Sequence, residues 1–367
     1  MSWTGSRIKE RAKEVNITLV KLSEAVGVSR QAINAWVGGQ VPRGQHLIKL
    51  CKELSIEPGY FFDTQEESLV SAPQHRTVGN KKVTNEISAA TMDMAIQYIN
   101  LFRSAPSSDL VPVVRSRNRD EEDAKKVAAQ LRELSDIDSD KPMDFEHIFD
   151  MLAKLGVYTV FRPFQDNASK KVYAFYSKIT GQRVVFVNTD TNIIDLKFQL
   201  LHETVHAVRD EGPSFENTEA EDAFCDLVAG YIQFPEDYVS LVAQAIKDCS
   251  GGVVINKLKE FAKAHKHSMY GVVKRLERSG VKLSVKVAPA DINLKKTTPK
   301  VSEIIFSDGD ARSYISKLHK LSPRFVTLVA EQVEHASIRK IGEWLGLDSS
   351  MDAQVVVEEL RRIRDDL

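Results

Sequence analysis

Apolar residues recur at helical or turn spacing through the first part of the chain and predict about five short helices. These helices are expected over residues 8–15, 19–26, 30–37, 44–54 and 58–62. Asn16 and Thr18 offer a cap for the second helix and Ser29 caps the third, while Gly27 makes the turn between them, because glycine enters the left-handed region at little cost. The residues expected to form a small core are Leu22, Val26, Val28, Ile33 and Trp36.

The pattern changes after this helical region. Residues 63–82 are polar, with scattered Ser, Gln, Pro and Gly, and indicate a flexible linker. Residues 87–102 carry apolar side chains at helical spacing, and residues 104–109 break the chain again. We therefore expect residues 65–116 to consist of a linker and connecting helices.

A helix-rich region with a small β-sheet is expected from residue 117 to residue 282. Helical spacing predicts helices over residues 119–133, 145–155 and 219–234, and around an apolar stretch near residue 200. Alternation with β-branched and aromatic residues predicts three strands, at residues 156–161, 173–176 and 184–187, with a turn around Thr180-Gly181 between the last two.

The remaining residues, 283–367, are expected to form a C-terminal helical region of unknown role. Residues 282–287 are compatible with a strand, and residues 288–300 are polar and contain proline, which predicts a loop. Helices are expected over residues 311–321, 323–336, 338–345 and 353–367. The fold class is therefore mostly α with a small β-sheet, divided into residues 1–64, 65–116, 117–282 and 283–367.

Composition and charge indicate the compartment of the protein and the kind of partner that it binds. With 50 Lys and Arg against 51 Asp and Glu, the net charge is −1, as in an ordinary soluble protein. No apolar run approaches the about 20 residues that span a bilayer, and the first residues lack an apolar signal core. Cys51, Cys225 and Cys249 are few and far apart, which fits a reducing cytoplasm and no cysteine-built zinc site. Residues 1–62 hold nine Lys and Arg against five Asp and Glu, and this excess of 9 − 5 = +4 favours contact with phosphates.

The chemistry centres on a His-Glu-x-x-His pattern at residues 202–206. His202 and His206 lie four residues apart, so on a helix they share a face and can bind one metal ion. Glu203 is placed to act as general base on a metal-bound water, and zinc suits this ligand set. Two surface histidines on an amphipathic helix are the plain alternative. The apolar residues that frame the motif argue for burial instead, and buried His and Glu need partners.

A catalytic zinc takes a third protein ligand, and the helix predicted at residues 219–234 offers several acids. Asp222 and Asp226 share a face, so Asp222 can bind the metal while Asp226 accepts the second ring N–H of a ligand histidine. Glu219 and Glu221 are alternative third ligands, although acids in a first helical turn are also favoured by the helix dipole alone.

Residues 22–36, Leu-Ser-Glu-Ala-Val-Gly-Val-Ser-Arg-Gln-Ala-Ile-Asn-Ala-Trp, resemble the helix-turn-helix domain of the lambda-repressor-like (XRE) family. Leu19 and Ser23 depart from the Gln and Ala usual in that family. The resemblance implies binding to a double-stranded DNA operator, with the second helix of the motif in the major groove. Arg30, Gln31 and Asn34 are then the expected base readers. A helical module that binds protein is the alternative.

Residues from about 120 to 280 resemble the ImmA/IrrE family of zinc metallopeptidases. The resemblance is carried by Asn188 after a strand, by Lys197-Phe198 before the motif, and by an acid at Asp222, counted back from Pro235. The family usually has Arg at the position of Lys197 and Glu at that of Asp222. It implies hydrolysis of an amide bond with Zn²⁺ as cofactor. Candidates for an oxyanion stabiliser, among which the sequence does not choose, are Tyr173, Tyr176, His265 and His267.

Together these features predict a cytoplasmic DNA-binding transcriptional regulator with a zinc-dependent endopeptidase domain. The family resemblance suggests that it cleaves a repressor, or its own linker, in a stress or mobile-element response. We expect a homodimer and no membrane partner. One alternative is a DNA-binding repressor whose metallopeptidase-like domain is catalytically silent. Another is a toxin–antitoxin or anti-phage component that acts through protein contact.

Overall fold

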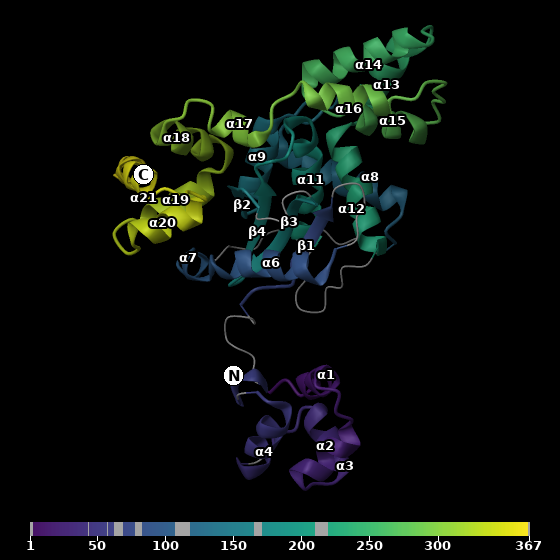
Figure 1. Ribbon diagram of the computed structural model, residues 1–367. Coiled ribbons are helices and arrows are strands. Elements are labelled where there is room, and N and C mark those ends of the chain that lie inside the picture. The colour runs from purple at the N-terminus through teal and green to yellow at the C-terminus, as the bar shows by residue number, and fades with distance from the viewer. Residues whose placement is uncertain are drawn as a thin grey trace. The chain divides into compact units, whose positions relative to one another are not determined.

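A computed structural model describes residues 3–42, 44–56, 58–61, 69–77, 83–106, 118–164, 171–209 and 219–365. The chain divides into two compact units, Met1–Ser71 and Ala72–Leu367 (Figure 1). The expected fold class, mostly α with one small sheet, is confirmed. The finer division at residues 64, 116 and 282 stays a prediction. No helix in the described ranges is long and apolar enough to cross a membrane.

The first unit is a cluster of short helices. They are α1 (Ser6–Glu14), α2 (Leu19–Val26), α3 (Arg30–Val37), α4 (Gly44–Leu54) and the 3₁₀ turn η1 (Pro58–Phe61). Thr18 Oγ1 accepts a hydrogen bond from Lys21 N at 3.3 Å and Ser29 Oγ one from Ala32 N at 3.2 Å, so both act as caps. Gly27 has φ +78°, as the turn requires. Leu22, Val26, Ile33 and Trp36 are buried as expected, and Val28 packs against them half-buried.

A four-stranded sheet forms the centre of the second unit, in the order β1-β3-β4-β2. The strands are β1 (Gln74–Thr77), β2 (Val157–Arg162), β3 (Val172–Ile179) and β4 (Gln182–Asn188). β3 and β4 form the expected hairpin through Thr180 and Gly181, which have φ +49° and +86°. β2 runs parallel to β4, and β1 runs antiparallel to β3.

Three local predictions were wrong. Residues 74–77 lie in the predicted linker but form β1, because their backbone pairs with the edge of β3, a contact that no local pattern reveals. Residues 282–287 form no strand, and residues 288–296 form a helix instead of a loop. Pro289 stands in the first turn of that helix, where proline is tolerated, so it begins the helix and does not break it.

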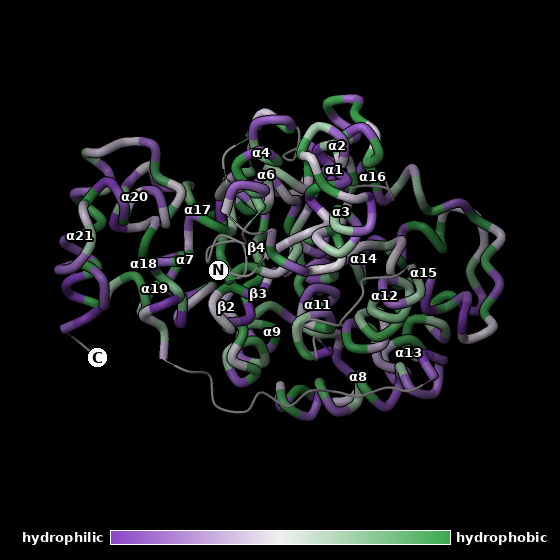
Figure 2. Tube along the Cα trace, turned by 90° about the horizontal axis from the view of Figure 1, so that it is seen from below, coloured by the Kyte–Doolittle hydropathy of each residue, from purple (hydrophilic) through white to green (hydrophobic). Residues whose placement is uncertain are grey.

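Helices cover the sheet and extend beyond it. Between residues 85 and 233 they are α6 (Asn85–Ile96), α7 (Ile99–Arg103), α8 (Glu121–Ser135), α9 (Phe145–Lys154), α11 (Ile193–Arg209) and α12 (Glu219–Gln233). Of these, α6, α9 and α11 pack directly on strands, and α8 and α12 pack on α9 and α11 respectively. The helical spacing expected over residues 87–102 corresponds to two connecting helices, α6 and α7. Figure 2 shows hydrophobic and hydrophilic positions alternating along α8, and the apolar ones, such as Val127 and Leu131, are buried. This is the amphipathic helix that the sequence predicts.

Two further helical groups complete the second unit. The first comprises α13 (Glu236–Ile246), α14 (Gly252–His265), α15 (Met269–Arg278) and α16 (Ala288–Lys296), which share an apolar core. The second comprises α17 (Val301–Ile305), α18 (Ala311–Leu321), α19 (Pro323–Glu331), α20 (Ile338–Leu345) and α21 (Ser350–Asp365). Tyr98, at the start of α7, donates a hydrogen bond from its hydroxyl to Trp344 O of α20 at 2.8 Å. The C-terminal helices are therefore docked to the rest of the unit.

Candidate metal centre

Helix α11 runs through the core of the second unit and carries the His-Glu-x-x-His pattern. It packs against β3, β4 and α12, and nearly all its residues from Ile194 onward are buried. His202, Glu203 and His206 have 0%, 0% and 2% of their surface exposed. The alternative of two surface histidines is therefore wrong for this helix.

Three donor atoms converge between α11 and α12 and form a donor triangle: His202 Nε2, His206 Nε2 and Asp222 Oδ1. His202 Nε2 lies 3.0 Å from His206 Nε2 and 3.1 Å from Asp222 Oδ1. His206 Nε2 lies 3.5 Å from the same carboxylate oxygen. A tetrahedral ion about 2.0–2.1 Å from each ligand needs donor atoms about 3.3 Å apart. The three measured separations lie on both sides of that value, so this donor set fits a zinc ion.

The ring nitrogens that face away from the donor triangle also meet side chains of α12. Asp226 Oδ1 lies 2.9 Å from His202 Nδ1, the position expected for a carboxylate that fixes the tautomer of a ligand. Cys225 Sγ lies 3.6 Å from His206 Nδ1. Burial lowers the pKa of His206 to about 4, so its imidazole is neutral at pH 7, as a metal ligand must be.

Cys225 is a site neighbour that the sequence analysis missed. Cysteine spacing excludes a cysteine-built zinc site but does not bear on a thiol beside a histidine ligand. The place of Cys225 one residue before Asp226, on the same predicted helix, was the available signal. Burial raises the pKa of its thiol, which is therefore protonated.

The structure distinguishes Asp222 from Glu221, one of the two alternative third ligands. Glu221 is fully buried and turns to Arg209, whose Nη2 donates to Glu221 Oε2 at 3.0 Å and whose Nε donates to Oε1. Arg119 Nε lies 2.7 Å from the same carboxylate. Burial alone would raise the pKa of Glu221, but the hydrogen bonds and charge of Arg209, together with the charge of Arg119, outweigh burial and lower the pKa. The side chain of Glu219 lies outside the described residues.

The Arg209–Glu221 pair also joins the two elements of the candidate centre. Arg209 follows His206 by three residues on α11, and Glu221 immediately precedes Asp222 on α12. The ion pair therefore holds the end of α11 against the start of α12 beside the donor triangle.

Lys197, the residue in place of the family's usual Arg, is buried on α11 with 2% of its surface exposed. Its Nζ donates to Met143 O at 3.0 Å and to His265 O at 2.7 Å, and lies over the Phe145 ring. Burial lowers its pKa to about 8. Lys197 thus ties α11 to the segment before α9 and to the last residue of α14.

The oxyanion candidates have different surroundings. Tyr176 is fully buried in the sheet. His267 is buried against Tyr238, whose hydroxyl lies 2.7 Å from Nε2, and burial lowers the pKa of His267 to about 3. The His265 ring packs edge-on against Tyr238. Tyr173 is the candidate that lines a cavity together with Asp226.

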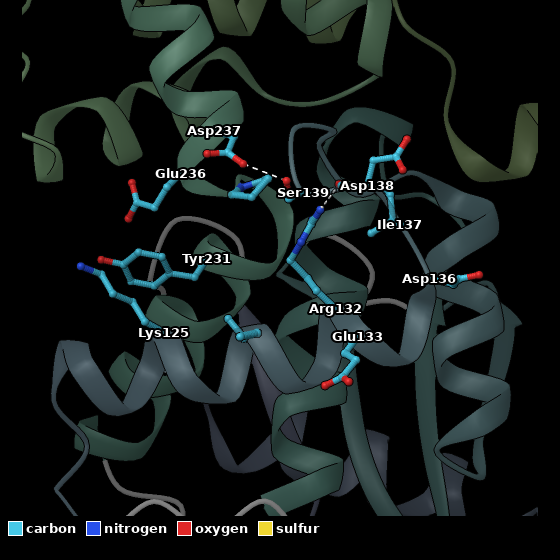
Figure 3. Close-up of a pocket in the computed structure, with 13 residues that line it drawn as sticks. Lys125, Arg132, Glu133, Asp136, Ile137, Asp138, Ser139, Tyr231, Glu236 and Asp237 are labelled. Carbon is cyan, nitrogen blue, oxygen red and sulfur yellow. Dashed lines mark hydrogen bonds between the residues drawn. The ribbon is translucent and has the colours of Figure 1, made fainter.

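A second cavity, of about 570 Å³, lies between α8 and the junction of α12 and α13 (Figure 3). Arg132 extends from α8 into the cavity and donates to the carbonyls of Ile232 and Asp138. Next to Asp138, Ser139 Oγ donates to Asp237 Oδ2 at 2.8 Å. Among its described lining residues, none belongs to the donor triangle, so the candidate active site lies elsewhere.

In the first unit, the predicted base readers share an exposed face. Arg30, Gln31 and Asn34 lie in the first turns of α3 and are exposed, while Ile33 and Trp36 on the same helix are buried. Leu19, which replaces the usual polar residue, is half-buried.

Comparison with family models agrees with both halves of the sequence analysis. Residues 8–61 match the model described as helix-turn-helix, and residues 152–274 match the model described as IrrE N-terminal-like domain. The chain joins a helix-turn-helix domain to an IrrE-like domain. The matched ranges contain α3 in the first unit and the whole donor triangle in the second. No curated protein and no solved structure gave a significant match.

These matches indicate a DNA-binding regulator with a metallopeptidase-like domain. The matches identify the two domains. The roles proposed for single residues rest on the distances and burial described above.

Proposed function

We propose that the chain is a zinc-dependent endopeptidase joined to a DNA-binding regulator, and that it cleaves a repressor or its own linker within residues 63–116. The observation that carries the proposal is the donor triangle of His202, His206 and Asp222, with separations of 3.0 to 3.5 Å. The carboxylate of Asp226 behind His202 supports it. A surface cluster of acids would not supply two buried imidazoles, nor a carboxylate beside the histidine nitrogen that faces away from the metal.

Each side chain then has a defined task. A zinc ion held by the triangle would lower the pKa of its water towards about 7 and polarise the scissile carbonyl. Glu203 accepts the proton of the attacking water on its carboxylate and delivers it to the leaving amine. Asp226 Oδ1, 2.9 Å from His202 Nδ1, would hold the proton of that ring on Nδ1 and leave Nε2 to bind the metal. The burial of α11 keeps bulk water away from these groups.

Glu203→Gln is the decisive variant, because it keeps the shape of the side chain and removes its basicity. The variant should bind one zinc per chain, measured by elemental analysis, and should lose cleavage of the repressor substrate and of the chain itself. Glu122→Gln, at a position 82% exposed on α8, is the matched control and should cleave as wild type. Wild-type protein that binds no zinc would refute the metal centre and favour a DNA-binding repressor with a silent second domain. Unchanged cleavage by Glu203→Gln would refute the mechanism.

For the first unit, we propose that Arg30, Gln31 and Asn34 read base edges of an operator and that the DNA-bound form is a homodimer. Their shared exposure at the start of α3 supports base reading, and one such module reads one half-site. Selection from randomised duplexes should yield a two-fold symmetric site. Arg30→Ala should weaken binding to that site about ten- to a hundredfold, with little change on unrelated DNA. Equal loss on both DNAs would show that Arg30 contacts only phosphate.

A cytoplasmic setting is proposed as well. Cys51, Cys225 and Cys249 form no disulfide, as a reducing compartment requires. Fractionation of cells that produce the protein would test it, and recovery from the medium or the envelope would contradict it.

A further inference from the structure

A cavity of about 630 Å³ lies beside the candidate metal centre. Its walls come from α11, α12, α15, α16 and the start of β3. Asp226, which contacts His202, lines it, and so does Phe198, whose ring centre lies 6.4 Å from that of His202. The cavity therefore begins next to the donor triangle and continues along the groove between α11 and α12.

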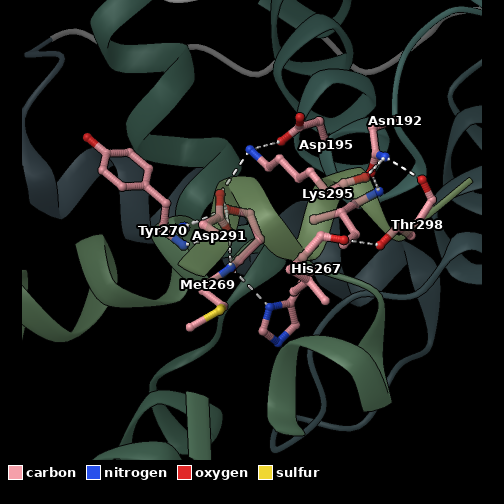
Figure 4. A network of polar contacts seen from close by, with 12 residues as sticks. Asn192, Asp195, His267, Met269, Tyr270, Asp291, Lys295 and Thr298 are labelled. Carbon is pink, nitrogen blue, oxygen red and sulfur yellow. Dashed lines mark hydrogen bonds and ion pairs between the residues drawn. The ribbon is translucent and has the colours of Figure 1, made fainter. Parts of the chain in front are cut away.

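The charged groups of this cavity are partly engaged with one another. Lys295 Nζ lies 2.8 Å from Asp195 and 3.0 Å from Asp291, so these two carboxylates offset its charge. Figure 4 shows Lys295 between the two acids. Arg275 is buried, with Nη2 3.1 Å from Glu236 and its guanidinium 3.9 Å from the centre of the Tyr231 ring. Neither cation is available to a ligand without losing these contacts.

Lys274 and Arg278 are the other two cations among the described residues that line the cavity. They stand four residues apart on α15, so they share a face, and both are exposed. Lys274 Nζ lies 3.1 Å from Glu277, but the two side chains are 52% and 49% exposed, and such a surface pair contributes little. The end of the cavity formed by α15 therefore presents two cations to solvent.

Helix geometry gives the distance along α12 from the donor triangle to the point where α15 crosses it. A Cβ added to Gly230 would lie 3.6 Å from Arg275 Cδ, so α15 meets α12 at this residue. Gly230 follows Asp222 by eight residues on α12, which is about 12 Å at 1.5 Å per residue. An extended peptide advances about 3.3 Å per residue, so three or four residues cover this distance.

We propose that this cavity is a substrate subsite for an acidic side chain, Asp or Glu, that lies three or four residues from the scissile bond and is held by Lys274 and Arg278. Phe198, Leu227 and Tyr270 line the cavity and provide an apolar wall for the residues between. The inference rests on the proposed peptidase activity and specifies the class of peptide that it would cut.

The test uses the full chain with zinc and a peptide library made from a digested proteome. Cut sites are aligned on the scissile bond, with Glu203→Gln as the background. We expect Asp and Glu to be enriched about two- to fivefold at the third or fourth residue on one side, the factor that a partly exposed ion pair supplies. Combined Lys274→Glu and Arg278→Glu should remove the preference and favour Lys or Arg there instead.

The control applies the same charge change elsewhere. Lys257 and Lys263 lie on α14 outside the cavity lining, and Lys257 is paired with Glu260 at 3.1 Å, much as Lys274 is paired with Glu277. Combined Lys257→Glu and Lys263→Glu should keep the wild-type preference. If this control also loses it, the effect is long-range charge and the subsite is refuted.

A second readout needs no turnover. The zinc-loaded Glu203→Gln protein is immobilised, and the library peptides that it retains are sequenced. Acidic peptides should be enriched, and the enrichment should disappear when Lys274→Glu and Arg278→Glu are added. Cleavage without acidic preference would overturn the subsite and leave the peptidase proposal intact. No cleavage above the Glu203→Gln background would overturn the peptidase proposal, and retained peptides without acidic enrichment would then overturn the subsite separately.

Discussion

Removal of the Glu221 carboxylate should loosen the junction between α11 and α12 beside the donor triangle. In Glu221→Ala the Arg209 guanidinium, 6% exposed, loses the carboxylate to which both Nε and Nη2 donate. Arg119, whose side chain is 43% exposed, can be solvated instead and adds little to the loss. The Phe224 ring, 4.6 Å from the Arg209 guanidinium, compensates only in part.

Breaking a buried ion pair from one side costs about 3–5 kcal/mol, because a charge is left without a partner in the interior. Hydrogen exchange followed by mass spectrometry measures this locally. Amides at the end of α11 and the start of α12 should exchange about a hundredfold faster or more. Peptides from the first unit serve as the internal control and should exchange as in wild type.

The double variant Glu221→Leu with Arg209→Met separates charge burial from packing. It removes both buried charges and should recover most of the lost protection, since a buried ion pair replaced by apolar residues is often neutral. The reasoning is refuted if Glu221→Ala exchanges like wild type, or if the double variant is as labile as the single one.

Three further predictions follow from particular contacts. Asp226→Asn should weaken zinc affinity about ten- to a hundredfold, because the carboxylate 2.9 Å from His202 Nδ1 fixes the orientation of that ring. Competition with a chromogenic chelator measures the zinc affinity, and an unchanged affinity would remove Asp226 from the site. Gly5→Ala should destabilise the first unit by about 1–3 kcal/mol, because the new Cβ would lie 2.0 Å from Trp36 O. Gly38→Ala, whose new Cβ would have its closest contact at 3.4 Å, is the control. Urea unfolding followed by tryptophan fluorescence compares the two variants, and equal unfolding midpoints would contradict the clash. For Lys197, the pKa falls from an unfolded value of 10.5 to about 8 in the folded state, so the unfolded chain binds more protons between these values and stability rises with pH across this window, by up to about 3 kcal/mol for this group. Below pH 8 the free-energy penalty for burying the charged Lys197 is fully present. Urea unfolding of Lys197→Met at pH 8, 9 and 10 should show a smaller rise of the unfolding free energy with pH than wild type. Identical rises would show that Lys197 is not desolvated.

Local pattern was enough to predict a large part of this protein. The bounds of α2, α3, α4, α18 and α20 agree with the residue ranges expected from spacing and caps. The shared face of His202 and His206 follows from the helix period alone, and the apolar frame of the motif correctly indicated burial. These properties depend on residues within a few positions of one another, which is why one sequence determines them.

Contacts between distant elements needed the tertiary structure. Glu221 and Asp222 are adjacent acids in one predicted helix, and only the packing of α12 on α11 turns one to Arg209 and the other to the two histidines. The placement of Cys225 behind His206 and the pairing of β1 with β3 are of the same kind. Helical spacing specifies which side chains share a face, but the partner of that face depends on how separate elements pack, and no local pattern carries that information.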